Sequence, residues 1–155
     1  MMDEREFEQR ARACRERLFR ICYAFLPDRA DRDDAIQEAL IKAWRKRDTL
    51  KDDALFEGWL IRIAVNECKN ILRRRKRRPE AELAETLPAE DLFPNFELRD
   101  ALRHMDIRLR IPVVLHYIEG YTVRETAHLL HIPLGTAKHR LSQAKAILQT
   151  QLKEE

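Results

Sequence analysis

The sequence predicts an all-α protein of two small helical domains joined by a flexible acidic linker. Only three of the 155 residues are glycine, and the abundance of Leu, Ala, Arg and Glu favours helices over sheets. Apolar residues recur at helical spacing in two blocks. Between them lies a proline-containing acidic stretch without an apolar stripe. We therefore expect a first domain at residues 1–78, a linker at 79–96 and a second domain at 97–155.

The net charge of +3 hides an uneven distribution of charge. Residues 62–78 hold eight Lys and Arg against one Glu, whereas residues 80–97 hold six acids and no Lys or Arg. The basic surface and the acidic connector are therefore separate parts of the chain. No apolar run approaches the roughly 20 residues of a membrane span, and the N-terminus lacks a signal-peptide pattern. We expect a cytoplasmic protein.

The first two helices are predicted from apolar spacing. Residues 4–25 are predicted to form one helix that Pro27 ends. A second helix, capped by Asp33 or Asp34, is expected to run to about Arg47. Its outward face carries six residues, namely Asp34, Gln37, Glu38, Ile41, Lys42 and Arg45.

A third helix is predicted at residues 56–78, after a loop at 48–55 that lacks helical periodicity. Asn66 and Asn70 lie four positions apart, so their amides share one face. Asn can donate and accept at a base edge, while Arg and Lys neutralise phosphates. Nucleic-acid binding is the leading interpretation; the alternative is an amphipathic helix whose charged end is merely solvated. The apolar stripe comprises Trp59, Leu60, Ile63, Ala64, Ile71 and Leu72, and the basic residues are Arg62, Lys69, Arg73, Arg74, Arg75, Lys76, Arg77 and Arg78.

The second block predicts a helix-turn-helix. Two helices are expected near residues 96–105 and 107–118, and Pro112 means that the latter starts late or bends. Thr122 followed by Glu125 is a capping-box pattern that opens a short helix. A turn at HIPLG leads to a longer helix at residues 136–152, which completes the motif. Its exposed recognition positions are Thr136, Lys138, His139, Ser142, Gln143 and Lys145.

Both blocks resemble one family. FEGWLIRIAVNECKN, with the basic run after it, resembles region 2 of extracytoplasmic-function (ECF) sigma factors, the compact group of the bacterial sigma-70 family. DDAIQEALIKAW resembles another part of region 2, and EGYTVRETAHLLHIPLGTAKHRL resembles region 4. The blocks stand in the family's order, and the resemblance covers nearly all of residues 10–152. The chain departs from the family at Gln143 and Lys145, where the family often has Arg.

The resemblance implies a sigma factor that directs core RNA polymerase to specific promoters. The first domain would hold the clamp of the largest polymerase subunit through Asp34, Gln37, Glu38 and Ile41. It would meet the minus-ten element through Asn66, Lys69, Asn70, Arg73, Arg74, Arg75 and Lys76. In this family the loop before the third helix forms a pocket for a flipped base, and Leu50, Asp53 and Phe56 could line it. For Phe56 and Leu55, a place in the core is the alternative.

The second domain would read the minus-thirty-five element as duplex. The resemblance assigns this to Thr136, Lys138, His139, Arg140, Ser142, Gln143 and Lys145. The implied partners are core RNA polymerase, including the flap of its second-largest subunit, promoter DNA and an anti-sigma factor.

The sequence shows no pattern typical of catalysis or metal binding. The five histidines and three cysteines lack zinc-ligand spacing, and no phosphate loop or nucleophile–base set occurs. We expect no enzyme activity, cofactor, metal or small-molecule substrate, and Cys14, Cys22 and Cys68 are interpreted as reduced packing residues. Two alternatives remain: a freestanding helix-turn-helix regulator that works without polymerase, and a nucleic-acid enzyme, against which the missing catalytic set argues.

Overall fold

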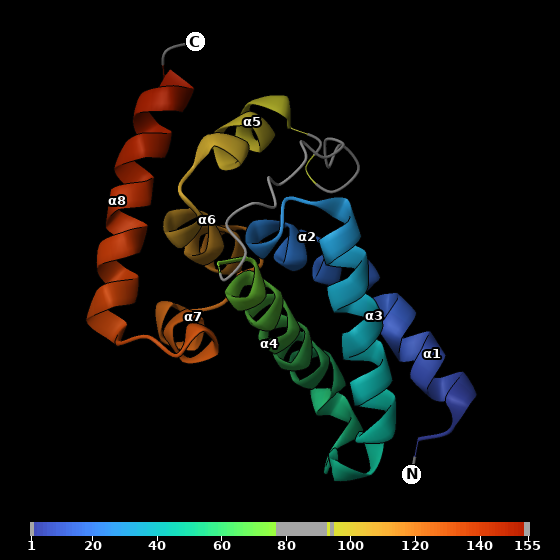
Figure 1. Ribbon diagram of the computed structural model, residues 1–155. Helices are drawn as coiled ribbons and strands as arrows, with labels where there is room; N and C mark the ends of the chain where they lie inside the picture. Colours follow the sequence, from blue (N-terminus) through green and yellow to red (C-terminus); the bar gives the residue numbers. More distant parts are fainter. Residues whose placement is uncertain (1, 77–92, 94, 154–155) are drawn as a thin grey trace. The chain divides into compact units, whose positions relative to one another are not determined.

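The computed structural model describes residues 2–76, 93 and 95–153, with backbone only at Lys76 and Lys153. Helices are the only regular secondary structure in these residues, which confirms the all-α prediction (Figure 1). The chain divides into two compact units, Met1–Leu87 and Pro88–Glu155. The predicted linker at 79–96 falls mostly outside the described residues. Within the described part, no helix is both long and apolar enough to cross a membrane.

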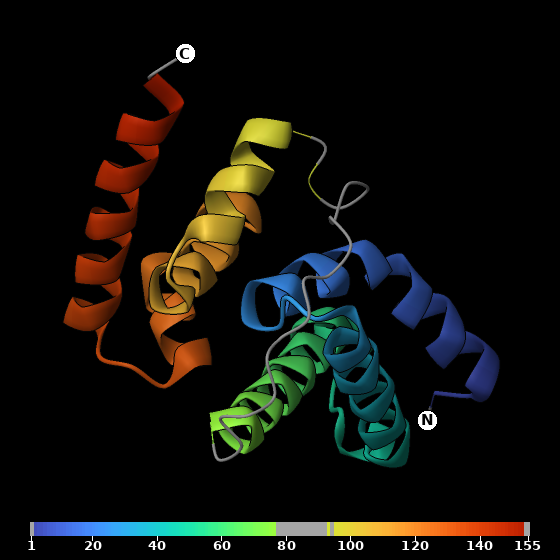
Figure 2. The ribbon, with the colours of Figure 1, turned by 45° about the horizontal axis from the view of Figure 1, so that its top comes forward.

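Unit 1 is built around a long pair of helices. The helices are α1 (Glu4–Ala13), α2 (Arg15–Phe25), α3 (Arg29–Arg45) and α4 (Phe56–Lys76), with short 3-10 turns η1 (Arg47–Thr49) and η2 (Asp53–Leu55) before α4. Figures 1 and 2 both show α3 and α4 side by side, and this is the most extensive helix pair of the unit. Packing along this pair places one long face of each helix at the surface.

Two predicted helix boundaries in unit 1 are wrong. The single helix at residues 4–25 is interrupted at Cys14, whose backbone (φ −106°, ψ 13°) leaves the helical region. The apolar spacing continues across this one-residue break, so the sequence pattern did not reveal it. The next helix begins at Arg29, because Asp28 accepts a hydrogen bond from the Ala30 N–H at 2.9 Å and caps it. Asp33 and Asp34 lie one turn inside that helix.

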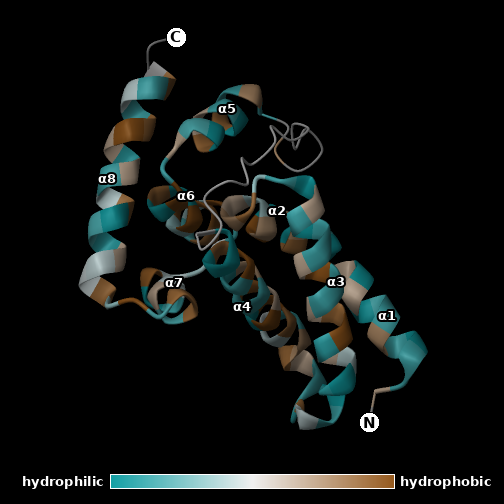
Figure 3. Cartoon of the chain, in the orientation of Figure 1, coloured by the Kyte–Doolittle hydropathy of each residue, from teal (hydrophilic) through white to brown (hydrophobic). Residues whose placement is uncertain are grey.

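The core of unit 1 joins α2, α3 and α4. Ile21, Cys22 and Phe25 of α2 are buried, and so is Ala39 of α3. The buried stripe of α4 differs from the predicted one, because Trp59, Ile63 and Leu72 are only half-buried. Its fully packed members are Phe56, Leu60, Ile61, Ala64, Val65, Cys68 and Ile71. Hydrophilic and hydrophobic residues alternate along α3 and α4 in Figure 3, as expected of amphipathic helices.

Unit 2 contains α5 (Phe96–His104), α6 (Ile107–Val113), the π-helical segment η3 (Val114–Ile118), α7 (Val123–Leu130) and α8 (Leu134–Lys153). Asp106 caps α6, so the helix does not start late around Pro112. Two residues after this proline the backbone widens into the π-helical segment, where the Glu119 N–H donates to the Val114 carbonyl at 2.9 Å. A π-helical turn beside a proline is one of the recognised ways in which a helix accommodates a lost hydrogen bond.

The helix-turn-helix is present as predicted. Thr122 Oγ1 accepts from the Glu125 N–H at 3.0 Å, and Glu125 Oε1 accepts from the Thr122 N–H at 2.9 Å. This reciprocal pair confirms the capping box. His131 ends α7 in the left-handed region, at φ 55°, and α8 then begins at Leu134, two residues before the predicted start. Ala137, Leu141 and Ala144 of α8 are buried, which leaves the opposite face of that helix in solvent.

Candidate nucleic-acid interface

The predicted amide pair lies on the surface of α4. Asn66 is exposed and Asn70, one turn later, is half-buried. Asn70 Oδ1 accepts a hydrogen bond from Arg73 Nη2 at 2.7 Å. That bond orients the Asn70 amide and directs its NH₂ group away from Arg73, because the oxygen is the atom engaged. Asn66 offers the more open amide of the two.

The basic residues of α4 do not behave alike. Arg73 and Arg74 are exposed, whereas Lys69 is half-buried. Burial removes the Lys69 ammonium from water and Arg73 repels it, so the pKa of Lys69 lies below its usual value. An anion near Lys69 and Arg73 would relieve that repulsion. The side chain of Lys76, together with Arg77 and Arg78, lies outside the described residues.

Arg75 was predicted to contact the minus-ten element, but its guanidinium faces α3. Its Nε lies 2.5 Å from Asp31 Oδ2 and its Nη2 lies 2.5 Å from Asp31 Oδ1, which makes a two-pronged pair with α3. Asp28 Oδ2 is 3.7 Å away. The hydrogen bond to Asp31 raises the pKa of Arg75. Arg75 is therefore engaged in joining α4 to α3.

A second exposed face lies on α3. Asp34, Gln37, Glu38 and Ile41 are all exposed, and their spacing places them on one side of the helix. This face combines acidic, amide and apolar groups. Lys42, which the sequence placed outward, instead pairs with the nearly buried Glu67 of α4 at 2.5 Å.

Of the three residues predicted to line a flipped-base pocket in the loop before α4, one departs from the prediction. Leu50 is half-buried and Asp53 is exposed, but Phe56 is only 3% exposed. Its ring centroid lies 5.5 Å from that of Phe7 in an edge-to-face arrangement. Phe56 is thus a core residue, as its alternative interpretation held, and it cannot line a surface pocket. For Leu55 the core alternative is wrong, because this side chain is 60% exposed and is the apolar side chain that the loop presents to solvent.

The exposed face of α8 carries the predicted recognition positions. Lys138, His139, Ser142, Gln143 and Lys145 are exposed, and Thr136 and Arg140 are half-buried. A surface hollow of about 750 Å³ is lined by Thr136, His139, Arg140 and Gln143 together with Asp106, Arg108 and Leu109 at the start of α6. The approach of α6 to α8 depends on tertiary packing, so no local sequence pattern pointed to Arg108.

The cysteines are buried, and the described residues contain no cluster of His, Cys, Asp and Glu suited to a metal ion. Burial raises the pKa of the Cys14 thiol to about 11. A hydrogen bond with Cys22, together with burial, raises the pKa of Cys68. Thiols held in their protonated form inside a core are poor nucleophiles and poor metal ligands.

Two family models match the chain. Sigma-70 region 2 matches residues 11–78, and Sigma-70, region 4 matches residues 95–148. The ECF RNA polymerase sigma factor SigM of Mycobacterium tuberculosis is 33% identical over 150 residues, which cover 94% of this chain and 76% of that protein. The ECF RNA polymerase sigma-E factor of Escherichia coli (strain K12) is 30% identical over 141 residues, which cover 79% of this chain and 74% of that protein.

Solved structures show the same likeness. The sigma factor RpoE in complex with the anti-sigma factor NepR, from Bartonella quintana, matches with a TM-score of 0.76 and 25% identity over 95% of this chain and 96% of that one. CnrH in complex with the cytosolic domain of CnrY matches with a TM-score of 0.67 and 25% identity, covering 99% of this chain and 91% of that one.

Proposed function

The chain belongs to the sigma-70 family as a sigma factor of the ECF group, and we propose how its two units divide the recognition of polymerase and promoter. In this proposal residues 1–78 hold core polymerase and the minus-ten element, residues 79–96 connect, and residues 97–155 read the minus-thirty-five element. The observation that carries the proposal is that each unit exposes a distinct polar face: α3 and α4 in one, α8 in the other.

The face of α3 is the proposed polymerase contact. Asp34, Gln37, Glu38 and Ile41 are exposed together although Ile41 is apolar, which suits a surface that a protein partner covers. Reversing the charge in Glu38→Lys combined with Gln37→Ala should weaken binding to core polymerase while helicity stays unchanged. Glu8→Lys, which makes the same charge change on α1, serves as the control. Undiminished affinity of the α3 variant would remove this face from the proposal.

The face of α4 is the proposed minus-ten contact. Asn66 and Asn70 would contact bases, and Lys69, Arg73 and Arg74 would attract phosphates without regard to sequence. Asn66→Ala should impair promoter opening at selected minus-ten positions without changing the salt dependence of binding. A loss of thermal stability with unchanged promoter preference would show instead that the amide only serves the fold.

The face of α8 is the proposed minus-thirty-five contact. A side chain at a base edge contributes about 1 to 3 kcal/mol of discrimination, whereas a phosphate contact affects all sequences alike. We expect His139 and Gln143 to discriminate and Lys145 to act on phosphate. Thr136, Lys138, Arg140 and Ser142 complete the proposed face. Binding of His139 and Gln143 variants to a panel of minus-thirty-five duplexes measures their contribution to sequence discrimination. Unchanged relative affinities would exclude base contact by these two residues.

The partners follow from the family. RpoE and CnrH are each bound to a protein partner in their solved structures, NepR and CnrY. We propose an anti-sigma factor for this chain, together with the clamp and flap of core polymerase and promoter DNA, acting in the cytoplasm. RNA synthesis is performed by the polymerase, so the chain contributes recognition and no catalytic step of its own.

One experiment tests the whole assignment. A pull-down of the full chain with core polymerase, followed by run-off transcription, should give polymerase binding and promoter-dependent transcripts. Duplex binding without polymerase binding would favour a freestanding helix-turn-helix regulator.

A further inference from the structure

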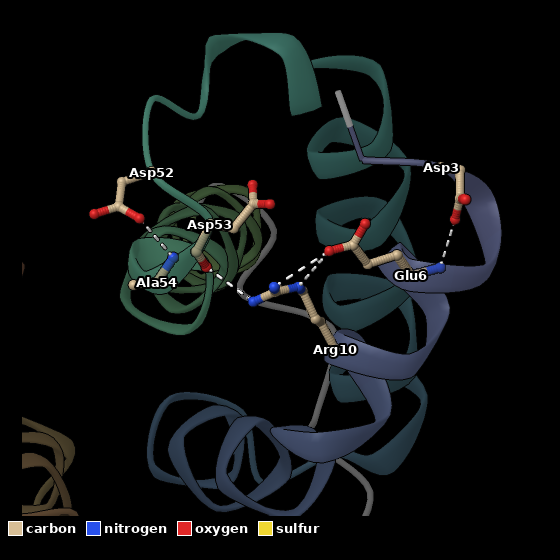
Figure 4. A network of polar contacts seen from close by, with 6 residues as sticks. All are labelled: Asp3, Glu6, Arg10, Asp52, Asp53 and Ala54. Atoms are coloured by element: carbon tan, nitrogen blue, oxygen red, sulfur yellow. Dashed lines mark hydrogen bonds and ion pairs between the residues drawn. The ribbon is translucent and has the colours of Figure 1, made fainter.

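A polar network joins the N-terminal helix to the loop that precedes α4 (Figure 4). Arg10 Nη1 donates to the main-chain carbonyl of Asp53 at 3.0 Å. The Nε and Nη2 groups of Arg10 face Glu6 Oε1 at 3.4 and 3.2 Å. The guanidinium lies between the Glu6 carboxylate and the Asp53 carbonyl in Figure 4. One side chain therefore links α1 to a segment more than forty positions later.

The bonded carbonyl is the one that closes the turn η2. The Asp53 oxygen also accepts from the Phe56 N–H, and Asp52 caps the same turn by accepting from the Ala54 N–H at 3.0 Å. The turn is thus closed from within by its own backbone and held from outside by Arg10. A charged donor makes a stronger hydrogen bond than a neutral one, so Arg10 favours this one conformation of the turn.

Other residues at the N-terminus contact the same segment. Arg47 Nε donates to the Met2 carbonyl at 3.2 Å, which ties η1 to the chain start. The Phe7 ring packs edge-to-face on Phe56 and on Trp44, with centroid distances of 5.5 and 5.3 Å. The family model begins at residue 11, so these contacts come from residues ahead of the matched region. The two ends of the 47–55 segment are therefore both held by residues 2–10.

We propose that Arg10, oriented by Glu6, is a positioning residue that sets the conformation of the 47–55 loop and, through it, the preference for the displaced promoter base. The inference rests on the base-binding role assigned to this loop by family resemblance. Leu50, Asp53 and Leu55 are the side chains whose direction depends on η1 and η2, and none of them is fully buried. Arg10 itself would touch no base and would act only through the Asp53 carbonyl.

The test compares two arginines of the same helix. Arg10→Met keeps the apolar stem of the side chain and removes the guanidinium. The hydrogen bond from that guanidinium to the Asp53 carbonyl is here called the tether. Arg12→Met is the matched control, because Arg12 forms the same i,i+4 ion pair, with Glu8 at 2.9 Å, and is 75% exposed. Hydrogen exchange of loop amides in the free full-length chain measures the tether. Run-off transcription with core polymerase, from promoters substituted at each minus-ten position, measures the preference.

We expect Arg10→Met to speed exchange of the loop amides about fivefold, a modest change because the Arg10 side chain is 37% exposed. The relative transcription of minus-ten variants should change, while the preference among minus-thirty-five variants and the salt dependence of binding stay as in the parent. Glu6→Gln should change both readouts in the same direction but less. Arg12→Met should match the parent in every measurement.

The proposal is overturned if Arg10→Met and Arg12→Met give the same promoter preferences. A change in exchange alone also overturns it, because the tether would then be purely structural. Leu50→Ala and Asp53→Ala are tested on the same promoter panel. They distinguish a failure of the positioning role of Arg10 from a failure of the base-binding role assigned to the loop. If these loop variants leave every preference unchanged, the loop binds no base and the inference fails with it. If they change preferences and Arg10→Met does not, only the positioning role fails.

Discussion

Arg75→Ala should destabilise unit 1 without weakening the electrostatic attraction to DNA. Sequence position alone would make Arg75 a phosphate contact, like its neighbour Arg74. The structure pairs it with Asp31 through two contacts of 2.5 Å each. The Asp31 side chain is only 10% exposed, so removal of Arg75 leaves a carboxylate largely out of water and without its partner.

The magnitude follows from that burial. Breaking a buried ion pair by removing one partner costs about 3 to 5 kcal/mol. Water reaches the Arg75 side chain, which is 28% exposed, and can partly solvate the abandoned carboxylate. We therefore expect a loss of about 2 kcal/mol in the free energy of unfolding. Arg75→Met combined with Asp31→Leu removes both charges and should recover most of that loss, because no unpaired charge is left behind.

Fluorescence during urea unfolding measures this in one unit. The two tryptophans of the chain, Trp44 and Trp59, both lie in unit 1, so their emission follows that unit. Arg74→Ala is the control: its exposed side chain should leave stability within about 0.5 kcal/mol of the parent, and the magnitude of the slope of log binding constant against log salt should fall by about 0.7 to 1. The reasoning is refuted if Arg75→Ala lowers the salt slope and leaves the unfolding free energy unchanged.

Three further substitutions test the caps and buried polar groups. Arg32→Met should cost unit 1 about 2 kcal/mol, measured by the same fluorescence, because the buried guanidinium donates to two carbonyl oxygens at the α2–α3 turn. Thr122→Ala removes half of the capping box and should lower the stability of unit 2 by about 1 kcal/mol, measured by hydrogen exchange in α7. The pKa of Asp106 is lowered from 3.8 by the Arg108 N–H and side chain, so its stabilisation is complete above that value and is lost as pH falls through the lower folded pKa. Asp106→Asn keeps the cap but should abolish this acid dependence in a circular-dichroism titration, and an unchanged titration would contradict the assignment.

Several features of the fold with a local cause were predictable from sequence, although the local cap of α3 at Asp28 was missed. The capping box at Thr122 has both of its halves within four residues, and the buried positions of α8 follow the helical repeat. The break at Cys14 was not predictable, because the apolar spacing runs through it unchanged. At Pro112 the sequence signalled a disturbance correctly, but whether a proline is met by a late start, a bend or a π-helical turn depends on the packing around it.

The sequence predicted which helix faces of the candidate site are exposed. It did not predict which residues within the site are held by contacts inside the fold. Asn66 and Glu38 are exposed as helical periodicity predicts. Arg75 pairs with a residue 44 positions away, and Phe56 packs on a ring from α1; no local pattern reveals either contact. In a run of consecutive arginines, sequence cannot separate those that face solvent from one that turns toward a neighbouring acid. Tertiary structure supplies that distinction.

That distinction changes how α4 is expected to bind the promoter. Among its described side chains, only Arg62, Arg73 and Arg74 are basic and exposed, because Arg75 is paired and Lys69 is half-buried. Each phosphate neutralised on a single strand contributes about 0.7 to the salt slope, so these three residues would supply a slope of about 2, and Lys69, the half-buried member of the proposed phosphate contacts, about 0.7 more. The net charge of +7 over residues 62–78 also counts Lys76, Arg77 and Arg78, whose side chains lie outside the described residues. In the proposed minus-ten contact, the described part of α4 would contribute only modest non-specific attraction, and discrimination would depend more heavily on the amide of Asn66 and on the shape of the loop that Arg10 holds.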